Sequence, residues 1–131
     1  MFLCDTTVLS ELACQQVDLG VATWASEVTE IAISVVTVEE ISYGLAAKPN
    51  LRVQAWFEQL LKSNCRVLPI SFEISNRSGE LRGMLRLSGK VRSQAGMLIA
   101  ATAQIHQLTL VTRNVRDFEN CGIPLLNPFR N

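Results

Sequence analysis

The sequence predicts an α/β fold in which helices cover both faces of a parallel sheet. Short apolar segments typical of strands alternate with helical patterns from one end of the chain to the other. No repeat, linker or low-complexity segment interrupts the alternation, and 131 residues suit one domain with one sizeable core. We therefore expect residues 1–131 to form a single α/β domain.

Five short apolar segments are the candidate strands. The clearest in the first half of the chain is apolar and rich in β-branched residues. In order, the five are Met1–Cys4, Ile31–Val36, Arg66–Ile70, Leu108–Val111 and a last one near Ile123–Leu126. No apolar run approaches the roughly 20 residues that cross a bilayer, so we expect no membrane segment.

Helical patterns fill the stretches between these strands. The expected helices are Val8–Ala13, Val17–Val28, one that follows Ser34 or Thr37, Leu51–Lys62, Ser71–Leu87 and an Ala-rich helix that ends near His106. Either Ser34 or Thr37 can cap the helix that follows the second strand, and Thr37 with Glu40 has the T-x-x-E spacing of a capping box. Gly44 and Lys48-Pro49-Asn50 are expected to close that helix.

Charge is distributed unevenly along a chain whose net charge is zero. Up to Lys48 there are seven acids and one base, and the remainder carries eleven bases and five acids. From Arg77 to Arg92 only Glu80 opposes five bases. Such a division suits an acidic metal pocket beside a surface that binds a polyanion, although solvated helix faces also carry charge runs.

The cysteines and the N-terminus indicate a reducing compartment. The four cysteines are scattered without a CxxC pair, which argues against a zinc site and favours free thiols. The N-terminus lacks the basic, apolar and small-residue order of a signal peptide. We expect a cytoplasmic protein.

Four oxygen-bearing side chains follow expected strands. Asp5 follows the first strand and Glu40 the second, while Asn114 and Asp117 lie in the polar turn after Leu108–Val111. Because the carboxyl ends of parallel strands meet at one sheet edge, we expect these side chains to converge. Carboxylates gathered in this way suit Mg²⁺ or Mn²⁺. Structural explanations also exist, since Asp5 can cap a helix and Asn114 tolerates unusual backbone angles.

Four blocks of sequence carry a family resemblance. They are L-C-D-T-T-V-L-S-E-L, I-S-V-V-T-V-E-E-I-S-Y-G, G-M-L-I-A-A-T-A and the ending L-T-L-V-T-R-N-V-R-D-F-E-N-C-G-I-P-L-L-N-P-F. Together these blocks resemble PIN domains, specifically the VapC-like toxins of bacterial toxin–antitoxin pairs, along nearly the whole chain. The resemblance implies a three-layer α/β/α fold, divalent-metal ribonuclease activity and a cognate VapB-like antitoxin that masks the site. It also implies a homodimer, or a heterotetramer or octamer with the antitoxin.

The resemblance assigns the family's acidic positions to residues of this chain. The first acid is Asp5 and the second is Glu40. The third, three residues before I-A-A in the Ala-rich helix, is Gly96. The fourth position is either Asn114 or Asp117. We take Asp5, Glu40 and Asp117 as catalytic candidates, and the metal positions as those of Asp5, Glu40, Gly96 and Asn114.

Gly96 departs from the family pattern in a way that bears on activity. Glycine offers no side-chain oxygen, and inside a helix it is about 1 kcal/mol less favourable than alanine. Losing one core acid is expected to weaken metal affinity and hydrolysis. Two explanations remain open: a weakened or silent PIN domain, or a glycine put in place of a natural aspartate so that a toxic protein can be produced. The intact motifs elsewhere favour the second.

The resemblance implies metal-assisted hydrolysis of RNA phosphodiester bonds, in which one or two Mg²⁺ or Mn²⁺ ions activate water. The expected substrate-binding residues are Thr6, Thr112, Arg113, Arg116 and Arg86. Phosphate contacts of this kind position RNA without reading its sequence, so the RNA target stays open. The arginines can alternatively receive the acidic tail of the antitoxin, or only solubilise helices.

Two other functions are weighed against the ribonuclease. The first is a catalytically silent PIN domain that acts as a binding module with an antitoxin in DNA-bound autoregulation, where only the antitoxin contacts DNA. The second is an unrelated Rossmann-like cofactor protein, which is weak because no G-x-G-x-x-G follows the first strand.

Overall fold

The structure is a computed structural model that describes all residues from 1 to 131. Its elements are β1 (Phe2–Cys4), α1 (Thr6–Leu12), α2 (Leu19–Ser26), β2 (Ile31–Ser34), α3 (Val35–Ala47), α4 (Leu51–Lys62), β3 (Cys65–Leu68), α5 (Phe72–Leu87), α6 (Gln94–His106), β4 (Thr109–Val111), the 3₁₀ helix η1 (Val115–Phe118) and β5 (Leu125–Leu126). The expected alternation of strands and helices is confirmed.

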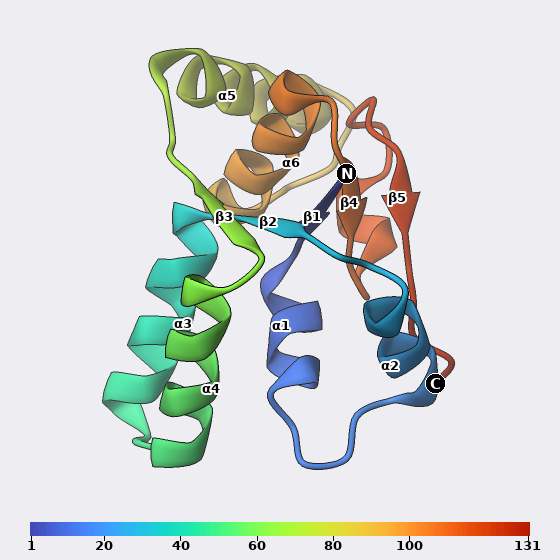
Figure 1. Ribbon diagram of the computed structural model, residues 1–131. Helices are drawn as coiled ribbons and strands as arrows, with labels where there is room; N and C mark the ends of the chain where they lie inside the picture. Colours follow the sequence, from blue (N-terminus) through green and yellow to red (C-terminus); the bar gives the residue numbers. More distant parts are fainter.

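All five strands pair in parallel, in the order β3-β2-β1-β4-β5 (Figure 1). The chain builds outward from β1 in one direction through β2 and β3, and in the other through β4 and β5. β1 and β4 are therefore the neighbours at which the strand order reverses. In open α/β sheets the crevice beyond the carboxyl ends of such strands is the usual ligand site. The register pairs Cys4 with Val111, so the residues that follow these two leave the sheet side by side.

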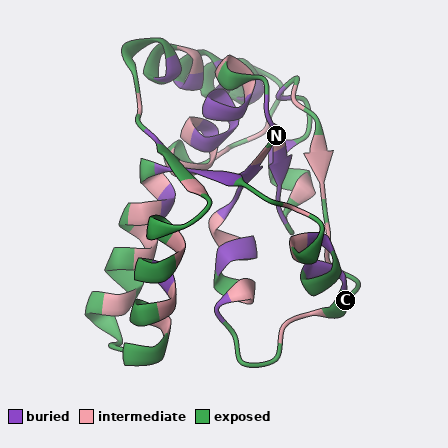
Figure 2. Ribbon diagram, viewed as in Figure 1, coloured by how far each residue is buried: buried purple, intermediate pink, exposed green.

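Two hydrophobic cores lie on opposite faces of the sheet, as the period of two in a strand requires. Leu3, Ala32 and Leu110 point toward α5 and α6, whereas the next residue of each strand faces the other core, against α1, α2 and α4. Figure 2 shows the buried strands between these two helical layers. The expected three-layer α/β/α arrangement is thus confirmed.

The boundary between β2 and α3 differs from the expectation. The strand ends at Ser34, whose hydroxyl accepts a hydrogen bond from Val36 N (3.0 Å) and caps α3. Of the two expected caps, Ser34 is therefore confirmed and the helix begins at Val35. The prediction of a capping box at Thr37 is wrong because Thr37 lies inside the first turn. Gly44 does not close the helix, which continues to Ala47.

Other helix and strand boundaries also differ from the expected ones, and the helix starts differ because of capping residues. Asp5 caps α1, which therefore begins at Thr6 rather than Val8. Asp18 caps α2, which is shorter than expected at both ends. β3 ends at Leu68 because Pro69 has no backbone N–H to donate. The four cysteines are all free, as expected. No helix is both long enough and apolar enough to span a membrane.

Candidate active site

An open cleft of about 740 Å³ lies beyond the carboxyl ends of β1, β2 and β4. It is lined by Asp5, Thr6, Thr7, Ser10, Glu11 and Cys14 at the start of the chain, Glu40 of α3, Val91, Arg92 and Ser93 before α6, Ala95, Gly96, Met97 and Ile99 of α6, Arg113, Asn114, Asp117 and Phe118 near η1, and Phe129. The predicted convergence of separate segments at one sheet edge is therefore what the structure shows.

Asp5 is the most enclosed acid of the cleft, with 7% of its surface exposed. Its Oδ1 accepts a hydrogen bond from Thr6 N (2.8 Å), and its Oδ2 accepts bonds from the hydroxyls of Thr112 (2.7 Å) and Thr7 (3.2 Å). Asp5 therefore caps α1 and faces the cleft at the same time. Three hydrogen-bond donors therefore fix the position of the Asp5 carboxylate.

Thr6 connects the two acidic positions. Its backbone N–H donates to Asp5, and its hydroxyl donates to Oε1 of Glu40 at 2.6 Å. The hydroxyl of Thr37 lies 3.1 Å from the Thr6 hydroxyl. The Thr6 hydroxyl has a single proton, and it donates this proton to Glu40 because a carboxylate cannot donate. The Thr37 hydroxyl is a second polar neighbour that helps to hold Thr6 in place. The other oxygen of Glu40 makes no hydrogen bond within the protein.

Gly96 lines the same cleft from the first turn of α6. The hydroxyl of Ser93 caps this helix by accepting a bond from Gly96 N at 2.9 Å. A Cβ at Gly96 would lie 2.9 Å from Ser93 Oγ and 3.9 Å from the Phe118 ring. A larger residue at this position therefore has to displace only the Ser93 hydroxyl, the cap of α6, because the Phe118 ring is at ordinary contact distance.

The turn after β4 supplies Asn114 and Asp117. Both line the cleft and are exposed. The backbone N–H of Asn114 donates to the Thr112 hydroxyl (3.0 Å), which ties the turn to the group that holds Asp5. Neither side chain makes a hydrogen bond to the protein, so both stay available to a ligand.

Three residues expected to bind substrate lie elsewhere. Thr112 is fully buried, and its side chain holds Asp5 instead of facing the cleft. The Arg116 side chain does not line the cleft, although its carbonyl accepts a bond from Arg92. Arg86 lies on α5 and lines a separate, smaller cleft. Thr6 and Arg113 do line the main cleft.

Phe129, near the end of the chain, lines the cleft, although no pattern in the sequence predicts its place there. The Arg113 guanidinium lies 4.6 Å from the centre of the Phe129 ring, and Nη2 donates to the carbonyl of Asn131 (3.0 Å). The backbone N–H groups of Arg130 and Asn131 donate to the Asp18 carboxylate at 3.1 and 3.3 Å. The bond from Arg130 is the main reason that the pKa of Asp18 lies below its ordinary value. No local signal links residues so far apart.

The thiol beneath the cleft is held in its neutral form. Burial, the neighbouring Cys65 and the charge of Asp5 all raise the pKa of Cys4. Burial also raises the pKa of the Cys65 and Cys121 thiols. None of these three groups lines the cleft, whereas Cys14 is exposed at its rim.

The oxygen donors of the cleft fit a hard divalent cation, but incompletely. Glu40 has one carboxylate oxygen without a partner, and Asp5 Oδ1 accepts only one bond. Mg²⁺ is often held by one or two carboxylates, with waters and substrate phosphates completing its shell. However, no three His, Cys, Asp or Glu side chains lie close enough together to hold a metal ion. Gly96 lines the same cleft and offers no side-chain oxygen.

Comparison with known proteins assigns the family. Residues 2–123 match the PIN domain. The chain belongs to the PIN domain family. This PIN domain is 34% identical to the VapC ribonuclease Y4jK of Sinorhizobium fredii, over 98% of both proteins. The resemblance expected from the four sequence blocks is confirmed.

Solved structures agree with this assignment. FitAcB from Neisseria gonorrhoeae superposes with a TM-score of 0.87 at 29% identity over 100% of both chains. A FitAB structure bound to an IR36 DNA fragment gives 0.86 at 26% identity, over 100% of this chain and 97% of the other. A toxin–antitoxin complex from Klebsiella pneumoniae gives 0.78 at 28% identity over 100% of both chains. The PIN domain fold is therefore shared along the whole chain.

Proposed function

We propose that this PIN domain is the toxin of a type II toxin–antitoxin pair and is built as a Mg²⁺-dependent endoribonuclease. The observation that carries the proposal is the Asp5–Thr6–Glu40 chain of hydrogen bonds at the floor of an open cleft. The name of the Sinorhizobium relative supports ribonuclease chemistry, and the Klebsiella complex supports an antitoxin partner. By the same likeness we expect a VapB-like antitoxin and a homodimer, or a heterotetramer or octamer with that antitoxin.

In phosphodiester hydrolysis, different residues of the cleft would bind the metal ion, bind the substrate phosphate and position the carboxylates. Asp5 and Glu40 would hold the metal ion, with Asn114 or Asp117 within the same cleft as a further oxygen donor. When bound, Mg²⁺ or Mn²⁺ supplies an activated water and neutralises charge on the scissile phosphate. Arg113, held at the rim by Phe129 and Asn131, is positioned to bind a phosphate of the substrate. Thr6 and Thr112 keep the two carboxylates in place.

Gly96 is the reason that we expect low activity in this sequence. The first turn of a helix favours a carboxylate, because the free N–H groups and the helix dipole stabilise negative charge there. An aspartate at this position would face Asp5 and Glu40 across the cleft. Without it only two of the three expected core acids, Asp5 and Glu40, line the cleft, which predicts weak metal binding and slow hydrolysis.

The deciding experiment compares RNA cleavage by the chain and by Gly96→Asp, with Mg²⁺ or Mn²⁺ and with EDTA. Gly79→Asp is the matched control, since it adds the same charge on an exposed face of α5 where a Cβ meets nothing within 4 Å. We expect metal-dependent cleavage from Gly96→Asp alone. A Gly96→Asp protein that is folded and as inert as the control would overturn the ribonuclease proposal.

Gly96 also favours a second candidate function, a silent PIN domain that serves as a binding module. In that case the chain binds its antitoxin, and the complex acts at operator DNA through the antitoxin. FitAB bound to a DNA fragment supports a complex of this type. Expression of Gly96→Asp without antitoxin separates the two: growth arrest supports the toxin, and normal growth supports the binding module.

A further inference from the structure

A second cleft of about 430 Å³ lies between α5 and the segment that leads into α6. It is lined by five residues: Arg82, Gly83 and Arg86 of α5, and Val91 and Arg92 of the connecting segment. Three of the five are arginines and none is acidic. The lining is therefore a concentration of positive charge with no aromatic side chain in it.

This basic cleft lies next to the cleft that contains Asp5 and Glu40, the acidic cleft. Val91 and Arg92, just before α6, line both of them. A ligand that occupies the acidic cleft and extends past Arg92 would reach the basic cleft. A linear polyanion is the kind of ligand that can follow such a path.

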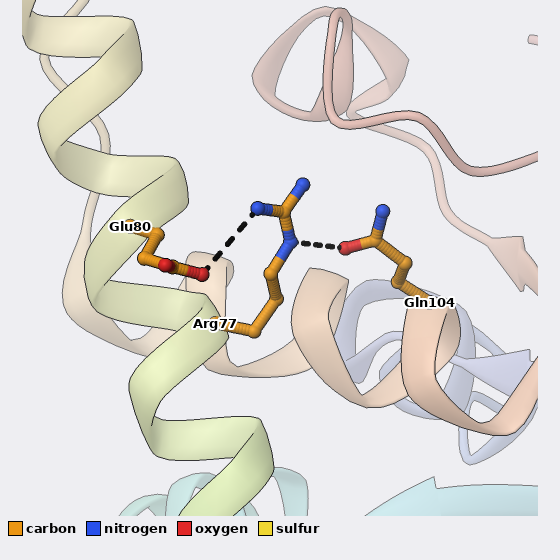
Figure 3. A network of polar contacts seen from close by, with 3 residues as sticks. All are labelled: Arg77, Glu80 and Gln104. Carbon is orange, nitrogen blue, oxygen red and sulfur yellow. Dashed lines mark hydrogen bonds and ion pairs between the residues drawn. The ribbon is translucent and has the colours of Figure 1, made fainter.

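The charges of the basic cleft have no partner within the protein. The chain has a single ion pair, in which Arg77 Nη1 lies 3.5 Å from Oε1 of Glu80 (Figure 3). Arg77 also donates through Nε to Gln104 of α6 at 2.7 Å, as the same view shows. Glu80, the one acid between residues 77 and 92, is thus engaged by Arg77. Arg82 and Arg86 lie one turn apart on α5, where like charges repel each other and an anion would relieve the repulsion.

Arg92 is held in place by neutral groups. Its Nη2 donates to the carbonyl of Arg116 (3.2 Å) and its Nη1 donates to the carbonyl of Val91 (3.4 Å), while its Nε is buried without a partner. Carbonyl oxygens orient the guanidinium but leave its charge uncompensated. The side chain is therefore fixed at the junction of the two clefts with capacity left for an anionic ligand.

We infer that the basic cleft binds the phosphodiester backbone of RNA beside the scissile bond, through Arg82, Arg86 and Arg92. Guanidinium groups match phosphate geometry and form paired hydrogen bonds with it. The cleft has no aromatic side chain and no side-chain acceptor for base edges, so we expect it to contribute affinity with little sequence preference. This inference rests on the proposed function, because it assigns the path of the same substrate away from the acidic cleft.

The test measures RNA binding by the chain as it exists, so that cleavage does not interfere. Fluorescence anisotropy of a labelled short single-stranded RNA gives the Kd at several salt concentrations. Arg82→Ala/Arg86→Ala is compared with Lys48→Ala/Lys62→Ala, which removes equal charge from α4 and the end of α3. Each phosphate contact on a single strand contributes about 0.7 to the salt slope. We expect the arginine variant to lose about 1.4 from the slope and to bind roughly tenfold more weakly.

Several outcomes would overturn the inference. The inference fails if the arginine variant and the lysine control have the same Kd for RNA and the same salt slope. Another such outcome is unchanged RNA binding together with lost binding of an acidic peptide, which would assign the cleft to a protein partner. The proposed function is tested separately by Gly96→Asp cleavage. An inert Gly96→Asp protein with a reduced slope in the arginine variant would reject the nuclease and retain the phosphate site.

Discussion

The hydroxyl of Thr6 donates a 2.6 Å hydrogen bond to Glu40, from a residue 34 positions earlier in the chain. Thr6 follows Asp5 directly, so one side chain connects the residue after β1 to α3. A single threonine therefore links the two acids. Residues that hold the carboxylates are as necessary to the cleft as the carboxylates themselves.

Gly96→Asp is expected to tighten Mn²⁺ binding by roughly tenfold or more, since even indirect supports of metal ligands are worth 10–100-fold. The added carboxylate joins Asp5 and Glu40, and only Ser93 Oγ has to shift. Isothermal titration calorimetry measures the affinity without any RNA present. Equal Mn²⁺ affinities of Gly96→Asp and the Gly79→Asp control would show that position 96 does not face the metal.

Thr6→Val keeps the shape of the side chain but removes the donor to Glu40. We expect metal affinity, measured in the Gly96→Asp background, to fall about 10–100-fold because the carboxylate is no longer oriented. Thr6→Ser retains the hydroxyl and is expected to keep most of the affinity. If valine and serine behave alike, the hydrogen bond has no role in metal binding.

Acid is expected to release the C-terminal segment from Asp18. Because backbone N–H groups, chiefly that of Arg130, lower the pKa of this carboxyl, its contribution to stability is present above the ordinary pKa of 3.8. The contribution is lost as the pH falls through the lower pKa of the folded state. In urea unfolding, Asp18→Asn should therefore be less stable than the unchanged chain at neutral pH, and the difference should shrink below pH 3.8. Glu39→Gln, on an exposed position of α3, is the control. A difference that stays constant with pH would contradict the assignment.

Cys14 should be the first thiol to react with a disulfide reagent at neutral pH. It is exposed at the cleft rim, whereas burial raises the pKa of Cys4, Cys65 and Cys121 above the ordinary 9.0. One fast thiol is expected in the folded protein, and RNA bound in the cleft should slow it. Cys14→Ser is expected to abolish the fast phase, and its persistence would place the reactive thiol elsewhere.

Local patterns were sufficient to predict the layers and the order of strands and helices, but not every element boundary. An apolar run followed by Asp5, or by Ser34 and a helical pattern, predicts a strand and then a helix from a few neighbouring residues. This is possible because helix caps act within one turn and side chains alternate every two residues of a strand. The T-x-x-E spacing at Thr37 is also a local pattern, and it could not exclude an earlier cap at Ser34. The choice between these two caps depends on where β2 stops pairing with β3, which is at Ser34 and Leu68.

The sequence by itself determined that Asp5 and Glu40 stand at strand ends and that Gly96 interrupts the set of acids. Only the tertiary structure decided which groups hold them. The bond from Thr112 to Asp5 joins residues 107 positions apart, and it exists because β1 and β4 are neighbours in register. The same holds for Phe129 against Arg113 and for Arg92 at the junction of the two clefts. Such contacts depend on strand order and helix packing, which no short window of sequence encodes.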